Sequence, residues 1–239
     1  DGVDTSTITR TAYIRALHPV YLPLVMRNYD PLLYDSFGNP AHDGAYDPAL
    51  WSKQCPDIPS LGQHDGRLVI YSSGTPESVD CTLVMRNPAQ RSLAELQVFE
   101  ARLWLDSARA GPYSLVKIQI TSDDIAGRGF WTQCHLISGT PPHFSCNLVT
   151  YEGGVYDWEY YSPSIAVNYD TWYTARIGVD PNTATFRYYL DGALVDSYTS
   201  KYAAALIPAS NFEPRVGAWF SAAGSEGTYL IDDVRITPP

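Results

Sequence analysis

Carboxylates at alternate positions are the first candidates for chemistry in this sequence. Asp157 and Glu159 are spaced i, i+2 in YDWEYY and share one face if this stretch is a strand, as a pair of acid and base catalysts requires. The preceding pair Gly153–Gly154 predicts a loop instead. The adjacent acids Asp123–Asp124 and Asp232–Asp233 point to opposite faces of a strand. We therefore assign no catalytic residue and expect a non-catalytic protein.

Other catalytic and cofactor signatures are also missing from the sequence. The five histidines (His18, His42, His64, His135 and His143) have no partner at i, i+2 or i, i+4, so their spacing does not indicate a zinc site or a Ser-His-Asp triad. No glycine-rich loop leads from a strand into a helix, which is the pattern that binds nucleotide phosphates. We expect no required cofactor.

The four cysteines lack the C-x-x-C spacing of zinc and thioredoxin sites. The chain begins at Asp1 without an initiator Met, and we interpret it as a processed, extracellular protein whose even number of cysteines favours disulfides. Cys134 and Cys146 bracket a predicted hairpin with an SGTPP tip, which brings two strands within bridging distance. The second disulfide, between Cys55 and Cys81, follows by elimination. The alternative is four buried thiols in a cytosolic protein.

Aromatic residues are abundant in this sequence: they make up 13% of the chain, with 18 Tyr and 6 Trp. Trp104 shares one face of a predicted strand with Glu100 and Arg102, a mixture that suits a sugar-binding surface. We expect further rings to join this surface, because flat rings stack on the apolar faces of sugars while charged groups bind hydroxyls. These rings are Trp131, Trp158, Tyr160 and Trp172. The alternative is that they fill the core.

Composition narrows the classes of protein. With 45% hydrophobic and 18% charged residues, the 239-residue chain is too apolar for a disordered protein, and it has no apolar run long enough to span a membrane. The net charge of -10 repels nucleic acids. The length suits one large all-β domain.

The elements that position these residues are predicted to be β-strands. From Leu33 onward, short runs rich in β-branched and aromatic residues alternate with turns, and Asp191-Gly192 is a two-residue hairpin signal. We expect a two-sheet antiparallel jelly-roll sandwich over 32–239, after an extended segment over 1–31.

The extended segment is apolar on both faces. Pro19 and Pro23 exclude a continuous helix, and the alternation there favours a strand that is buried on both sides. We expect this strand to complete the sheet of a neighbouring subunit, giving a head-to-tail filament. The assembly residues are Tyr13, Ile14, Leu17, Val20, Leu22 and Leu24. The stretch VYLPLVMRN resembles extensions of secreted bacterial surface proteins, which implies the bacterial cell surface.

Three stretches carry a resemblance to a known superfamily. YDSFGNPAHDGAYDPALWS, WYTARIGVDPNTATFRYYLDGALVDSY and VGAWFSAAGSEGTYLIDDVRI resemble the opening, the penultimate hairpin and the closing strands of concanavalin A-like lectin/glucanase jelly rolls. This resemblance implies the sandwich fold, which serves lectins, glycosidases and structural domains. Glycosidases of that superfamily carry E-x-D-x-E on one strand, and this motif is missing here.

The same resemblance implies a structural calcium site. The closing strand of this superfamily often supplies an Asp to calcium near the first strand, so Asp232 or Asp233 with Asp35 are the expected ligands. Strict alternation places Asp232 on the apolar face with Val234. The alternative is an acid that caps backbone amides or pairs with Arg235.

Two functions from different classes remain. The leading hypothesis is a non-catalytic extracellular structural subunit that assembles through its N-terminal strand. The alternative is a lectin-like module that binds glycans on the cell surface. A glycosidase ranks third, because it requires two carboxylates that face each other.

Overall fold

The computed structural model describes residues 33–56, 59–75, 77–86, 98–107, 114–123, 127–202, 211–221 and 226–237. The expected N-terminal strand with its six assembly residues (Tyr13, Ile14, Leu17, Val20, Leu22 and Leu24) lies outside this part of the chain. No helix within the described ranges is long and apolar enough to cross a membrane.

Two antiparallel sheets make up the fold. Sheet A contains β1 (Leu33–Asp35), β3 (Ser60–His64), β4 (Arg67–Ser73), β6 (Val98–Leu105), β12 (Tyr173–Asp180), β13 (Thr185–Leu190), β14 (Ala193–Thr199) and β16 (Glu226–Thr237). Sheet B contains β2 (Trp51–Gln54), β5 (Val79–Met85), β7 (Ser114–Asp123), β8 (Arg128–Ile137), β9 (His143–Glu152), β10 (Val155–Tyr161), β11 (Ile165–Ala166) and β15 (Asn211–Phe220). A short 3-10 turn, η1, spans Pro40–His42.

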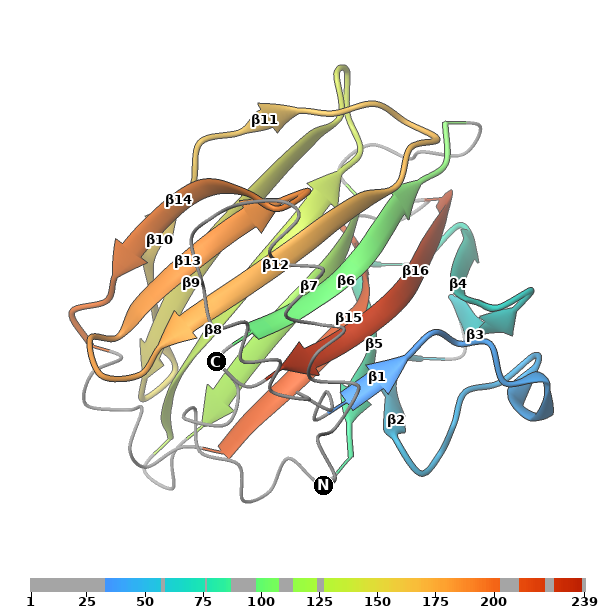
Figure 1. Ribbon diagram of the computed structural model, residues 1–239, viewed down its shortest axis with the longest axis horizontal. Helices are drawn as coiled ribbons and strands as arrows, with labels where there is room; N and C mark the ends of the chain where they lie inside the picture. Colours follow the sequence, from blue (N-terminus) through green and yellow to red (C-terminus); the bar gives the residue numbers. More distant parts are fainter. Residues whose placement is uncertain are drawn as a thin grey trace, which may run out of the picture. The chain divides into compact units, whose positions relative to one another are not determined.

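The strand orders are those of a sandwich, which confirms the predicted fold class (Figure 1). Sheet A runs β14-β13-β12-β6-β16-β4-β3, with β1 paired to β16. Sheet B runs β10-β9-β8-β7-β15-β5-β2, with β11 paired to β9. Strands β7, β8 and β9 therefore lie in the interior of sheet B, and β10 forms one of its edges.

The core lies between the sheets because inward positions are apolar. On β6, the side chains of Phe99, Ala101 and Leu103 are buried while those between them are partly exposed. From sheet B, Phe130 packs its ring edge-to-face on Phe186 of sheet A with centroids 5.5 Å apart. The alternation that predicted the strands therefore also places the core.

Two tight turns of similar conformation connect the strands of two hairpins, one at an edge of each sheet. Asp191 and Gly192 have φ of 49° and 80° and connect β13 to β14, which confirms the predicted hairpin. Gly153 and Gly154 have φ of 58° and 82° and connect β9 to β10. The loop expected from this glycine pair is wrong, because glycines that adopt positive φ turn the chain back into the edge strand β10.

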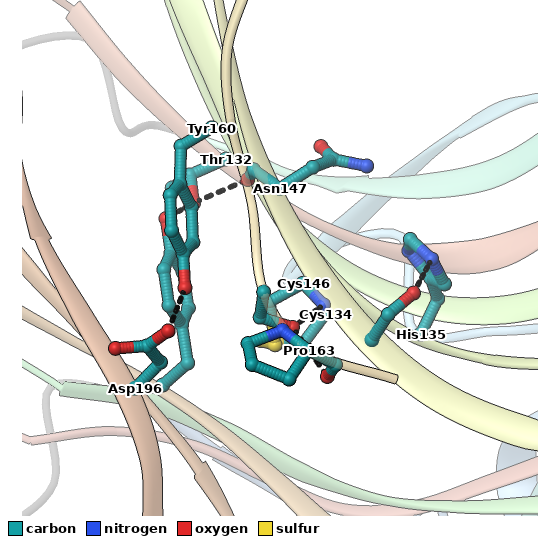
Figure 2. Close-up of a disulfide and its surroundings, with 11 residues drawn as sticks. Thr132, Cys134, His135, Cys146, Asn147, Tyr160, Pro163 and Asp196 are labelled. Atoms are coloured by element: carbon teal, nitrogen blue, oxygen red, sulfur yellow. Dashed lines mark hydrogen bonds between the residues drawn. A yellow bond between two sulfur atoms is a disulfide. The ribbon is translucent and has the colours of Figure 1, made fainter. Parts of the chain in front are cut away.

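Both expected disulfides are present. Cys134 and Cys146 are directly opposite each other on β8 and β9, and their bond lies in the buried core (Figure 2). Cys55, just after β2, is bonded to Cys81 on the neighbouring strand β5. The two disulfides thus reinforce neighbouring strands of sheet B.

The closing strand β16 departs from strict alternation. Tyr229 and Ile231 are buried, and so are Val234 and Ile236, because a β-bulge between Asp232 and Arg235 shifts the pattern by one residue. Asp233 has a φ of 49° at this bulge. The expectation that Asp232 shares a face with Val234 is therefore wrong.

A buried tryptophan links the two sheets near the first strand. Trp51 on β2 of sheet B donates from Nε1 to Oδ2 of Asp35 on β1 of sheet A, at 2.7 Å. The other oxygen of Asp35 accepts from the backbone N of Phe37 at 2.7 Å. Trp51 is fully buried and lies against the Phe37 ring.

We expect Trp51→Phe to lower the free energy of unfolding by about 2 to 3 kcal/mol, because it leaves Asp35 Oδ2 without its donor and removes buried volume. Urea unfolding measures the change. Trp104→Phe on the outer face of sheet A is the matched control and should change stability by less than about 1 kcal/mol. Equal losses in the two variants would contradict a special role for the Trp51–Asp35 hydrogen bond.

Candidate functional site

Five aromatic side chains gather on the face of sheet B that points away from sheet A. We call Trp131, Tyr151, Tyr156, Trp158 and Tyr161 the aromatic platform. The Trp131 ring lies 5.4 Å from that of Tyr156 and 6.1 Å from that of Trp158. Trp158 and Tyr161 stack with centroids 5.1 Å apart and an interplanar angle of 11°. Tyr156, Trp158 and Tyr161 are each at least 50% exposed, which is unusual for large aromatic side chains.

A polar floor continues from the platform across the same face. It consists of Lys117, Gln119, Gln133, His135, Ser145 and Asn147, which the strand register places in two rows across β7, β8 and β9. Ser145 Oγ lies 2.8 Å from His135 Nε2, and Lys117 Nζ donates to Asp80 at 2.8 Å. His135 Nδ1 and Asn147 Oδ1 are buried without a hydrogen-bond partner. These two atoms are buried, and Lys117, Gln119, His135, Ser145 and Asn147 are each at most 8% exposed, so this part of the face is closed to solvent in the structure.

The floor carries no carboxylate. On β8 the outward side chains at alternate positions are Trp131, Gln133 and His135, the spacing in which E-x-D-x-E presents three acids. Among the described side chains that face outward on β7, β8 and β9, none is Asp or Glu. A two-carboxylate reaction cannot be assigned to these positions.

His135 is held neutral by its surroundings. Burial, with smaller contributions from the positive charge of Lys117 and from the neighbouring His143, lowers its pKa to about 3. The neutral ring accepts or donates at Ser145 without introducing a charge on the floor. At neutral pH His135 is thus an uncharged, buried hydrogen-bond partner of Ser145.

A cavity of about 360 Å³ lies at the β9–β10 hairpin. We call it the hairpin cavity; its lining residues are Arg128, Thr150, Tyr151, Glu152, Val155, Asp157 and Tyr202. Most of these side chains face the opposite side of the hairpin from the platform, because Thr150, Glu152, Val155 and Asp157 alternate with Tyr151 and Tyr156 along the paired strands. Tyr151 belongs to both features, so the cavity and the platform adjoin.

The predicted sugar-binding residues are divided between separate surfaces. Glu100, Arg102 and Trp104 lie on the outer face of sheet A, where the Arg102 guanidinium is 4.8 Å from the Trp172 ring. Trp131 and Trp158 instead belong to the platform on sheet B. The single surface expected for these residues is therefore not formed.

Tyr160 lies between the sheets. Its ring stacks on Tyr188 of β13 and on Tyr198 of β14 with centroids 5.7 and 4.7 Å apart, and its hydroxyl donates to Asp196 at 2.6 Å (Figure 2). Desolvation and the hydrogen bond to Asp196 both raise the pKa of Tyr160. Its contacts fasten the edge strand β10 to sheet A and do not present its ring to a sugar.

The acids proposed for calcium have protein partners in the structure. Asp35 accepts from Trp51 and Phe37, and Asp233 accepts from the Tyr34 hydroxyl at 2.9 Å. The Arg102 guanidinium lies 3.8 Å from Asp232 and 3.6 Å from Asp233. No cluster of three His, Cys, Asp or Glu that could hold a metal occurs within the described ranges. Calcium at these acids remains a prediction.

The acids Asp157 and Glu159 do not act as a pair, because a bulge between Trp158 and Tyr160 interrupts their alternation. Asp157 lines the hairpin cavity, while Glu159 accepts from Ser200 Oγ at 2.7 Å and from the Lys201 backbone N at 3.2 Å. Sequence analysis missed Arg128, Glu152, Tyr151, Tyr156 and Tyr202 as site residues. The signal that identifies most of them is the Gly153–Gly154 turn, which makes 143–161 a hairpin.

Comparison with solved structures shows the concanavalin A-like jelly-roll fold. The β-glucanase of Bacillus licheniformis matches with a TM-score of 0.57 and 15% identity, covering 87% of this chain and 98% of that chain. The laminarinase of Flavobacterium sp. UMI-01 matches with a TM-score of 0.60 and 11% identity, covering 87% and 99%. A non-specific endo-β-1,3(4)-glucanase matches with a TM-score of 0.58 and 10% identity, covering 92% and 94%. No protein-family model and no curated protein sequence matches the chain.

These matches overturn the functional hypothesis drawn from the sequence. The similar structures are mostly glucanases and transglycosylases, which contradicts the prediction of a non-catalytic filament subunit. The lectin-like alternative also fits them less well than a glycosidase does, and the rings predicted to share its binding surface lie on separate faces. The two disulfides are consistent with an extracellular protein.

We expect His135 to make stability depend on pH. Because its pKa is about 3 in the folded state and about 6.5 in the unfolded state, the unfolded state binds more protons between these values, and stability falls as the pH falls from 6.5 to 3. The loss is about 1 kcal/mol per pH unit within this window. Urea unfolding at pH 7 and 4.5 should show a smaller loss for His135→Gln than for the wild type. The exposed His64→Gln is the control, and an unchanged pH dependence in His135→Gln would contradict the assignment.

Proposed function

We propose that this protein is an extracellular carbohydrate-active enzyme that hydrolyses or transfers glycosidic bonds of a polysaccharide, held against edge strand β10 and the outer face of sheet B. The observation that carries the proposal is the gathering of exposed rings on the platform beside the polar floor. The fold shared with glucanases and a transglycosylase supports the reaction class. The resemblance of the N-terminal stretch supports the bacterial cell surface as its location.

The platform has the chemistry that sugar rings require. Trp158 and Tyr161 are half exposed and stacked on each other, so they form a rigid apolar surface that loses little side-chain entropy when a sugar binds. Unlike a protein core, this surface adjoins polar side chains. The amide of Gln133 on β8 is partly exposed and lies on the same face two strands from Tyr161, where it suits the hydroxyls of the same sugar chain.

The proposed substrate class is a β-linked glucan. The similar structures include a laminarinase and a non-specific endo-β-1,3(4)-glucanase, and the exposed rings of the platform suit a neutral glucan. A protein with a net charge of -10 also repels anionic polysaccharides over a longer range.

The wild-type protein should release oligosaccharides from a soluble β-1,3-glucan or β-1,3(4)-glucan, as measured by chromatography of the products. Trp158→Ala should weaken glucan binding about tenfold or more in affinity electrophoresis, because it removes one of the two stacked rings. Trp104→Ala on sheet A is the matched control and should bind as the wild type does. Failure of the wild type to bind or cleave either glucan would contradict the proposal, as would equal effects of the two substitutions.

A further inference from the structure

Cleavage of a glycosidic bond by the common two-carboxylate route requires two carboxyl groups about 5 to 10 Å apart. Among the described side chains of β5 and β15, the outward carboxylates do not provide such a pair. Asp80 is ion-paired with Lys117 and Glu213 with Arg215, at 2.8 and 2.6 Å. Trp219 is opposite Asp80 and lies six positions beyond Glu213, which separates the two acids by roughly 20 Å.

The hairpin cavity does bring two carboxylates together. Glu152 is opposite Val155 across the β9–β10 turn, and Asp157 follows two positions further on the same face. These are diagonal neighbours, with backbone positions roughly 7 to 8 Å apart. Both residues line the cavity, and both side chains reach solvent. The side chains of Glu152 and Asp157 therefore extend from neighbouring positions of one face into the same cavity.

The rest of the lining distinguishes this cavity from a simple acidic patch. Arg128 is directly opposite Glu152 on β8 and adds a positive charge to the lining. Tyr202 approaches from the segment that follows β14 of sheet A and supplies an exposed ring. The cavity volume of about 360 Å³ lies within the range of small-ligand sites.

Exposed apolar side chains connect the platform with this cavity. Trp158 and Tyr156 are 50% and 59% exposed on the platform side of β10, and Val155 is 73% exposed on the cavity side. Because β10 is an edge strand, a polymer can pass over it from one side to the other without crossing another strand. A glucan chain stacked on the platform thus has a continuous path to the two carboxylates.

We propose that Glu152 and Asp157 are the catalytic carboxyl pair of this protein, an assignment that rests on the proposed function. One carboxyl group, protonated, donates its proton to the glycosidic oxygen as the bond from C1 to that oxygen breaks. The other, ionised, either bonds to C1 or takes a proton from the water whose oxygen bonds to C1. Water supplies the hydroxyl group of the new reducing end and the proton that restores the acid, and a sugar hydroxyl replaces water in transfer.

The test compares Glu152→Gln, Asp157→Asn and the control Glu226→Gln, an exposed acid at the start of β16, in the full chain. With β-1,3-glucan and β-1,3(4)-glucan as substrates, we expect each cavity variant to lower kcat about 100-fold or more. Each should retain glucan binding and the wild-type melting temperature. The pH-rate profile of each should lose one of its two limbs, which a structural role would not cause.

The outcomes separate this assignment from the proposed function. Cleavage by the wild type together with wild-type rates in folded Glu152→Gln and Asp157→Asn overturns the carboxyl pair alone. Glucan binding without cleavage by the wild type overturns both the pair and the proposed enzymatic function. If the wild type shows no binding and no cleavage, the proposed function itself is overturned. The assignment of Glu152 and Asp157 is supported if both variants lose kcat, retain glucan binding and show a pH-rate profile with one limb.

Discussion

The two sheets can enclose a common core only if every strand turns its apolar side chains to the same side. This constraint fixes the outer face of sheet B as well as its interior. On β8, burying Phe130 and Cys134 between the sheets requires that Trp131, Gln133 and His135 face outward. The proposed binding face is therefore a direct consequence of how the core is packed.

The same constraint explains what the sequence could predict. Alternation and turn residues identified the sandwich, the Asp191-Gly192 hairpin and the Cys134–Cys146 disulfide, because these depend on local pattern and on neighbouring strands. The Cys55–Cys81 disulfide followed only by elimination. The bulge at Asp232–Asp233 was missed because one extra residue shifts the alternation without a composition signal. The grouping of Trp104 with Trp158 failed for another reason. A strand pattern gives the side of each ring within its own sheet but not which sheet it belongs to.

The edge strand β10 combines several features that are separate elsewhere in the sandwich. Tyr160 fastens it to sheet A through stacked rings and Asp196, while Tyr156 and Trp158 remain exposed on its outer side. A rigid edge with exposed rings is suited to holding a polymer, since the ordering of its side chains is already complete before binding. The acid pair of the hairpin cavity lies at the same edge, whereas the interior strands present amides and a neutral imidazole.

The account depends on a glucan chain that lies on the platform and passes over β10 into the hairpin cavity. A crystal structure of Glu152→Gln soaked with a β-1,3-linked gluco-oligosaccharide tests this most directly. The account predicts a sugar ring stacked on Trp158 or Tyr161 and a glycosidic oxygen within hydrogen-bond distance of Asp157. Sugar bound instead beside Trp172 on sheet A, or confined to the floor without reaching β10, would contradict it.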